Sequence, residues 1–170
     1  MSKKFIWMPV LLIITVLISG CIFDKDSGTT PPVKLDLIPT TNLPVGFTYM
    51  GVHEVSFDIN NSSMNATEGV YRYNNKDDVY ILVIKSDNPE ALMNQYKLQL
   101  KKQFKTDFNP FEEISFNGHK ATKVTDYSTV NGRQTPNYAI IWATGKAMIL
   151  VSSSTADART VIALATATGS

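Results

Sequence analysis

Cysteine and histidine are scarce in this chain, which contains Cys21, His53 and His119 as its only residues of these types. A lone cysteine cannot form an internal disulfide, so the fold must rely on its own apolar core. A catalytic zinc site needs three protein ligands, and His53-Glu54 lacks the second histidine of a zinc-binding helix. We therefore expect neither a metal site nor a cofactor.

Familiar catalytic motifs are also missing. No serine lies in a Gly-x-Ser-x-Gly elbow, and no glycine-rich loop could hold a phosphate. The carboxylate pairs Asp77-Asp78 and Glu112-Glu113 are expected in a turn and at a strand start, where solvation explains them better than acid–base catalysis. We predict no catalytic residue and place His119 in a surface hairpin, although a Ser/His/Asp triad assembled from distant segments stays open.

An excess of charge of one sign is absent as well. The chain has 16 basic and 15 acidic residues, and its formal net charge of +1 would become −1 on losing Lys3 and Lys4. No overall field would draw it to nucleic acid, which we exclude as a partner.

The N-terminus carries the clearest pattern. Lys3 and Lys4 precede an uncharged, mostly aliphatic run from Phe5 to Ile18. A short cationic segment followed by such a run is typical of an export signal, predicted here over residues 1–20. The lysines should remain on the cytoplasmic side.

The end of that run, Ile18-Ser19-Gly20-Cys21, resembles the lipobox of prokaryotic lipoproteins. The resemblance implies cleavage before Cys21 and attachment of a lipid to its thiol, which acts as the nucleophile. An uncleaved transmembrane anchor over Phe5–Phe23 is the alternative. Both interpretations place the rest of the chain at the outer face of the cytoplasmic membrane.

Prolines then interrupt the chain up to Pro44, so we interpret residues 21–44 as the lipidated cysteine and a tether, with a short strand over Val33–Ile38 as the alternative. One extracytoplasmic domain is expected over residues 45–170, a length sufficient for a single core. Strand-like segments are Phe47–Asp58, Gly69–Asn74 and Val79–Lys85.

Two helices are predicted in this domain. Asp87 or Asn88 caps the first, Pro89 opens it, and Met93, Tyr96, Leu100 and Phe104 recur on one face. The second is capped near Ser154 and ends at Gly169, with Val161, Ile162 and Ala165 facing inward.

Four further strands are expected between the helices, at Phe111–Phe116, His119–Tyr127, Tyr138–Ala143 and Ala147–Ser152. Asn117-Gly118, Asn131-Gly132 and Thr144-Gly145 supply the turns. The predicted class is α+β, with a curled and mainly antiparallel sheet of about seven strands in the order β-β-β-α-β-β-β-β-α. An offset of 67 aligns the two halves, for example Tyr71 with Tyr138 and Leu82 with Ile149, which indicates either an internal duplication or convergent patterning.

This architecture resembles the PsbP-like family and the exported lipoproteins of the LpqN type, and the tethered whole is similar to surface lipoproteins of methanogenic archaea. The resemblance implies a non-catalytic binding, adaptor or sensing module whose partner is an envelope protein, a polymer or a small ligand. An envelope-directed hydrolase is the alternative function.

Three groups of residues remain as candidates for contacts or modification. Lysines at four-residue spacing could meet anionic lipid or polymer, or merely solvate a helix: Lys97, Lys101 and Lys105, with Lys102 beside them. Aromatic strand residues could line a ligand face, or cover a core: Tyr71, Tyr73, Tyr138 and Trp142. Three Asn-x-Ser/Thr sequons in one expected polar loop predict glycosylation at Asn60, Asn61 or Asn65, with Asn65 preferred.

Overall fold

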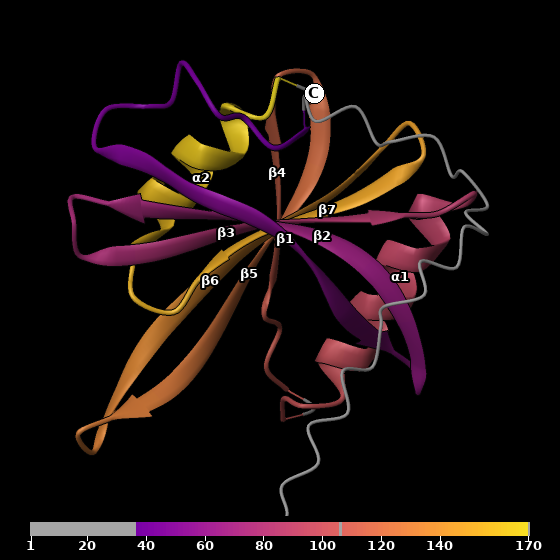
Figure 1. Ribbon diagram of the computed structural model, residues 1–170. Coiled ribbons are helices and arrows are strands. Elements are labelled where there is room, and N and C mark those ends of the chain that lie inside the picture. Colours follow the sequence, from indigo (N-terminus) through magenta and orange to yellow (C-terminus); the bar gives the residue numbers. More distant parts are fainter. Residues whose placement is uncertain (1–36, 106, 170) are drawn as a thin grey trace, which may run out of the picture. The chain divides into compact units, whose positions relative to one another are not determined.

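The computed structural model describes residues 37–105 and 107–169, which belong to one compact unit running from Pro32 to Ser170. The described residues form a single sheet of seven strands and two helices, shown in Figure 1. The sheet order is β1-β2-β3-β7-β6-β5-β4, and every neighbouring pair is antiparallel. The predicted order of elements is therefore confirmed, although strands predominate over helices.

The elements follow one another with short connections. They are β1 (Phe47–Ile59), β2 (Ser62–Tyr73), β3 (Asp77–Lys85), α1 (Pro89–Lys101), β4 (Phe111–Phe116), β5 (His119–Val130), β6 (Arg133–Thr144), β7 (Ala147–Ser153) and α2 (Ala158–Thr166). Several strands are longer than expected. The largest difference is at β2, which begins seven residues before the predicted Gly69.

The tight turns depend on residues that tolerate a positive φ. Asn117-Gly118 and Asn131-Gly132 have φ values of 48° and 79°, and 50° and 76°, as a type I′ turn requires. Asn60-Asn61, with φ values of 50° and 65°, joins β1 to β2 in the same way. The expected polar loop is consequently a two-residue turn followed directly by a strand.

Both helices begin at side-chain caps. Asn88 accepts a hydrogen bond from the backbone N–H of Ala91, and Pro89 occupies the first turn of α1. Asp157 caps α2, rather than a residue near Ser154, and its bond to the N–H of Thr160 holds its pKa below the usual value. Helix α1 ends at Lys101, so Phe104 lies beyond it and not on its apolar face.

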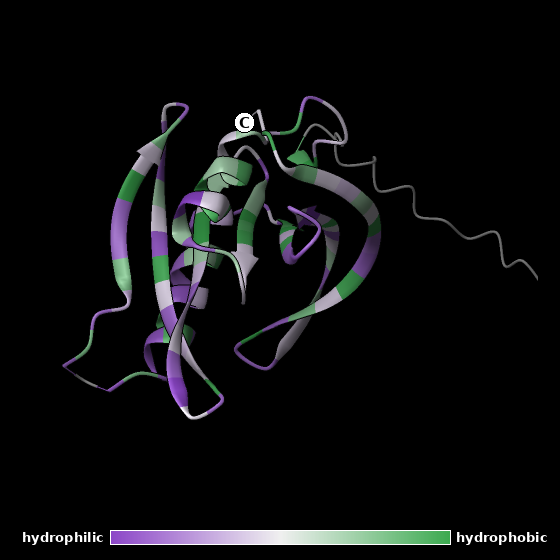
Figure 2. Ribbon diagram, turned by 90° about the vertical axis from the view of Figure 1, so that its left-hand side faces the viewer, coloured by the Kyte–Doolittle hydropathy of each residue, from purple (hydrophilic) through white to green (hydrophobic). Residues whose placement is uncertain are grey.

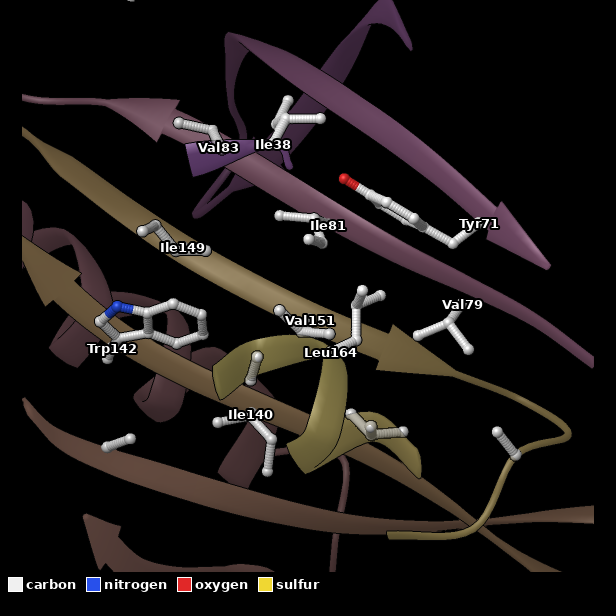
Figure 3. Close-up of a cluster of buried hydrophobic side chains, with 14 of the residues drawn as sticks. Ile38, Tyr71, Val79, Ile81, Val83, Ile140, Trp142, Ile149, Val151 and Leu164 are labelled. Atoms are coloured by element: carbon white, nitrogen blue, oxygen red, sulfur yellow. The ribbon is translucent and has the colours of Figure 1, made fainter. Parts of the chain in front are cut away.

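The two helices cover opposite faces of the sheet. On one face, α2 packs through Val161, Leu164 and Ala165 onto the cluster that Figure 3 shows around Trp142, Ile149 and Ile81. On the other face, α1 packs through Leu92 onto a cluster that includes Leu82 and Leu150. Residues 81–84 and 147–151 are apolar in succession because both faces of the central strands β3 and β7 are buried. Figure 2 shows the contrasting alternation of hydrophilic and hydrophobic residues along the outer strands.

A bulge in β1 transfers its apolar residues from one face to the other. Tyr49 pairs with Tyr71 and packs on the α2 side, whereas Phe57 and Ile59 belong to the α1 side. All three positions are odd-numbered, so a regular strand would place them on the same face of the sheet. The register shift between Tyr49 and Gly51 inserts one extra residue, and this reverses which residues face each side. The distal half of β1 can therefore fold over α1.

The offset of 67 aligns residues that face opposite sides of the sheet. Leu82 lies in the cluster under α1, and Ile149, its counterpart, lies in the cluster under α2. If the two halves were duplicates, a twofold rotation would exchange β3 with β7, which are antiparallel neighbours. The axis of that rotation is perpendicular to the sheet, so it would place both helices on the same face. Because the helices lie on different faces, the structure favours convergent patterning over duplication.

Residues 37–44 belong to the domain and not to the tether. Ile38 is buried against the α2-side cluster, with Leu37 and Leu43 packed beside it. The hydroxyl of Tyr71 donates a 2.9 Å hydrogen bond to the carbonyl of Pro39. The domain therefore begins earlier than the expected residue 45, which shortens any spacer to residues 22–36.

Candidate functional site

The tip of the β1–β2 hairpin is fastened to α1 by one glutamine. The side-chain oxygen of Gln99 accepts a 2.7 Å hydrogen bond from the backbone N–H of Asn60, and its amide group donates to the carbonyl of Asp58 at 3.4 Å. The rings of Phe57 and Tyr96 meet beneath this contact, with centroids 5.2 Å apart. The hairpin tip is thus held over the C-terminal half of the helix.

A polar cavity of about 500 Å³ lies at this junction, and we call it the hairpin-tip groove. Its lining comprises Asp58, Asn60, Asn61, Ser63, Gln99 and Lys102. Asp58 is engaged on one side, because the Ser63 hydroxyl donates a 2.6 Å hydrogen bond to its carboxylate. The groove therefore offers a polar ligand both donors and acceptors. The carboxylate accepts hydrogen bonds, the ammonium donates them, and the two asparagine amides can do both.

The sequence did not point to this groove. Asp58 and Gln99 belong to no motif, and they meet because β1 bends over α1 after its bulge. The consecutive asparagines Asn60 and Asn61 were a signal for a tight turn, since asparagine tolerates the left-handed backbone conformation. That signal would have located the hairpin tip but not the helix residues facing it.

The three sequons lie on this same hairpin. Asn60 and Asn61 form the turn and line the groove, and all three asparagines are exposed. Asn65 lies within β2, where it pairs with Ser56, and not in a loop as expected. Glycosylation at Asn60, Asn61 or Asn65 stays a prediction.

Two of the four candidate lysines turn toward the protein. The ammonium of Lys97 donates to Glu113 at 3.1 Å and to the buried Thr122 at 2.8 Å, and it lies 5.4 Å from the centre of the Phe111 ring. Lys101 donates to the backbone carbonyl of Phe108. These contacts join α1 to β4, β5 and the segment before β4, so the expected lysine stripe is not a solvent-facing row.

Lys102 and Lys105 differ from the other two. Both are exposed, and neither side-chain ammonium forms a hydrogen bond or ion pair with the described part of the chain. Lys102 is the C-cap of α1, and Lys105 follows the helix. The pair available for an external anion is therefore Lys102 and Lys105.

The two histidines occupy separate parts of the sheet. His53 on β1 forms a 3.0 Å contact with Glu68 on β2, its cross-strand partner. His119 starts β5 after the Asn117-Gly118 turn, and its ring lies 6.3 Å from that of Phe116. Within residues 37–105 and 107–169, no three His, Cys, Asp or Glu side chains gather as a metal site would require.

The carboxylate pairs form cross-strand contacts with cations. Asp77 and Asp78 begin β3 instead of forming the turn before it, and Asp78 receives a 2.8 Å bond from Arg72, which lowers the pKa of that carboxyl. Glu112 lies 2.5 Å from Lys123. The hydrogen bond from Lys97 likewise holds the pKa of Glu113 below its usual value. Asp78 and Glu112 thus pair with cations on neighbouring strands, and Glu113 joins β4 to α1.

The aromatic strand residues mostly fill the core. Tyr71 and Trp142 are fully buried, and burial raises the pKa of the Tyr71 hydroxyl. The Trp142 ring meets the Phe116 ring edge-on, with centroids 5.0 Å apart. Figure 3 shows Trp142 among the buried side chains of the cluster. Tyr138 is partly buried at the cluster margin, and Tyr73, also partly buried, has its ring centroid 5.0 Å from that of Phe47. An aromatic ligand-binding face on Tyr71 and Trp142 is therefore ruled out by their burial.

The predicted export signal, the lipobox and the lipidation of Cys21 concern residues 1–36, which lie outside the described residues. Across the described residues, neither helix has the length and apolar character needed to span a bilayer. No family model and no curated protein matches this chain. A solved GTP binding regulator from Thermotoga maritima is similar over 76% of this chain and 80% of its own, with 13% identity and a TM-score of 0.44. That likeness is too low to assign a family or a ligand.

Proposed function

We propose that the protein is a membrane-anchored extracytoplasmic lipoprotein whose single domain is a non-catalytic binding module. The observation that carries this proposal is the position of Cys21, which follows two small residues at the end of a charge-free run. A compact domain with its own two apolar clusters follows after a short stretch of chain. A lipid on Cys21 would hold that domain beside the membrane.

The distribution of polar side chains supports binding over hydrolysis. General acid–base catalysis needs a proton acceptor within hydrogen-bond reach of the reacting group, in a site shared with other functional groups. His53 and Glu113 are instead committed to neighbours on adjacent strands or on α1. The envelope-directed hydrolase remains the alternative that experiment must exclude.

The hairpin-tip groove is the recognition site in this proposal. Asn60, Asn61 and Lys102 present exposed side chains at the groove, and the hydrogen bond from Asn60 to Gln99 holds the turn that carries the two asparagines. Sites held on rigid elements lose less freedom on binding. Its partner would be a polar envelope protein, polymer or small ligand, with no nucleic acid involved.

Membrane anchoring is tested by Cys21→Ser in the full chain, compared with Ser19→Ala, which keeps a small residue before the cysteine. Metabolic lipid labelling and partition into detergent should be lost in Cys21→Ser and retained in Ser19→Ala. If Cys21→Ser keeps its mass, processing and membrane association, the lipoprotein assignment fails and an uncleaved anchor over Phe5–Phe23 replaces it.

The non-catalytic part is tested by His53→Ala and His119→Ala. Turnover of an envelope glycan or peptide substrate that disappears in either variant, with the circular dichroism spectrum unchanged, would establish the hydrolase instead.

A further inference from the structure

The outward side of α1 from Ala91 onward, together with the residues up to Lys105, carries positive charge and no acidic residue. Between Ala91 and Lys105 the sequence contains four lysines and no acidic residue. Leu98 is 65% exposed there, and in a helix it lies next to Lys102 four residues later. A large apolar side chain thus stands in water beside Lys102, and neither the Lys102 ammonium nor the Lys105 ammonium has a partner in the described part of the chain.

Three aromatic rings in contact join the segment after α1 to the long β5–β6 hairpin. Phe104 contacts Phe108 with ring centroids 5.4 Å apart, and Phe108 contacts Tyr127 at 6.1 Å. Phe104 and Phe108 are partly exposed, and Tyr127 is 48% exposed. We call the set Leu98, Lys102, Phe104, Lys105, Phe108 and Tyr127 the α1 surface.

The net charge of this region is positive. Lys101 adds a third positive charge, because its bond to the Phe108 carbonyl does not neutralise it. Asp107 is exposed nearby, and Asp126 precedes Tyr127, so these two carboxylates offset part of the charge. Lys97 is paired with Glu113 and contributes little.

The chain length before the domain limits how far this surface can lie from a lipid anchor. Residues 37–44 pack against the sheet, so residues 22–36 alone separate Cys21 from the domain. A chain of that length spans at most about 50 Å when fully extended. A domain of this size has a radius of gyration of about 14 Å, so any of its faces can reach the membrane.

We propose that the α1 surface rests on anionic phospholipid headgroups, so that the domain lies on the membrane instead of standing away from it. This rests on the proposed lipid anchor at Cys21. Leu98 and the aromatic rings fit the boundary between headgroups and acyl chains, where amphipathic rings and aliphatic side chains are stabilised. Lys102 and Lys105 meet the phosphates, and a lysine near an anionic surface strengthens binding roughly fivefold. The anchor keeps the domain at high local concentration, so that a weak contact suffices.

The test places the full, membrane-extracted chain in nanodiscs of phosphatidylcholine alone or of phosphatidylcholine and phosphatidylglycerol in equal parts. Backbone hydrogen exchange over residues 98–108 is compared between the two, at low and high salt. The charge-reversal variant is Lys102→Glu with Lys105→Glu. The matched control is Lys76→Glu with Lys146→Glu, which reverses two exposed lysines in strand-connecting turns.

Exchange over residues 98–108 should slow severalfold in the anionic nanodiscs, and salt or the Lys102/Lys105 variant should abolish the slowing. The control should behave as wild type. Equal exchange in both lipids, or an equal loss in the control, overturns the proposal. A soluble anionic polymer can also be added to the phosphatidylcholine nanodiscs. If the polymer slows exchange over residues 98–108 and phosphatidylglycerol does not, the membrane proposal is overturned and the partner is a polymer. The mass of the peptide that contains Cys21, measured in the same samples, shows whether the lipid anchor is present. A lipidated chain whose exchange over residues 98–108 is not slowed refutes the membrane contact of the α1 surface and leaves the anchor standing.

Discussion

The side-chain oxygen of Gln99 on α1 lies 2.7 Å from the backbone nitrogen of Asn60 in the β1–β2 turn and accepts its hydrogen bond. This contact joins residues 39 positions apart and closes one side of the hairpin-tip groove. The groove therefore depends on a helix residue that faces a strand turn.

Replacing Gln99 by alanine should loosen the hairpin tip without unfolding the domain. The lost bond is solvent-accessible, so the free energy of unfolding should fall by about 0.5–1.5 kcal/mol. Hydrogen exchange over residues 57–64 should accelerate more than in the rest of the sheet. Gln95→Ala, an exposed position on the same helix, is the control. Equal exchange at the tip in both variants would mean that Gln99 does not hold the hairpin.

Trp142→Ala should be among the most destabilising single substitutions. The ring is fully buried against Phe116 and the α2-side cluster, and truncation of such a residue costs about 3–5 kcal/mol. Its indole nitrogen has no hydrogen-bond partner among the described residues, so Trp142→Phe should cost clearly less. Urea unfolding measures both, with the exposed Tyr127→Ala as control. A loss below 1 kcal/mol for Trp142→Ala would contradict the burial of this ring.

The sequence was sufficient to predict the order of elements because the local signals agree with the fold. Pro89 after Asn88 starts α1, and the two Asn-Gly pairs make the turns that flank β5. The groove could not be predicted in the same way. It depends on a one-residue bulge after Tyr49, which redirects Phe57 and Ile59 toward α1 and is marked in the sequence by Gly51 alone.

The lysines show a second limit of sequence patterns. Spacing alone places Lys97 and Lys101 on one helix face, but it does not say which face meets the sheet. The structure shows that Glu113 and Thr122 on β4 and β5 bind Lys97, so the lysine lies between elements. Ile38 was similarly hidden, because prolines on both sides of it indicated a tether.

The boundary of the domain is tested at Ile38 and Gly69. A Cβ added to Gly69 would lie 2.5 Å from the Ile38 side chain, so Gly69→Ala must displace that side chain. We expect a loss of about 1–3 kcal/mol for Gly69→Ala and about 2–5 kcal/mol for Ile38→Ala, measured by urea unfolding. Val45→Ala, at a fully exposed valine, should stay within about 0.5 kcal/mol. If Ile38→Ala were as neutral as Val45→Ala, residues 37–44 would belong to the tether after all.

Glu113 should contribute to stability in a pH-dependent way. The hydrogen bond from Lys97 lowers its pKa below the ordinary 4.5, so the folded protein favours the ionised carboxyl. The contribution is therefore present above pH 4.5 and is lost as the pH falls through the depressed folded-state value. Because the side chain is 70% exposed, we expect less than about 1 kcal/mol.

Urea unfolding of wild type and Glu113→Gln measures this at neutral and strongly acidic pH. The variant should be less stable at neutral pH, and the difference should vanish in acid. Asp107→Asn, at an exposed carboxylate, provides the control. A difference that persists unchanged in acid would show that the Glu113 charge has no part in it.

The intact mass of the protein purified from the membranes of its native host tests the central claim most directly. The account predicts a chain that begins at Cys21, lacks residues 1–20 and carries a mass increase on the cysteine equal to a diacylglyceryl group, with further acylation or glycans adding to it. Proteolytic mapping should place the lipid on the peptide containing Cys21. A chain that retains Phe5–Ile18, with an unmodified thiol at Cys21, would contradict the lipoprotein assignment.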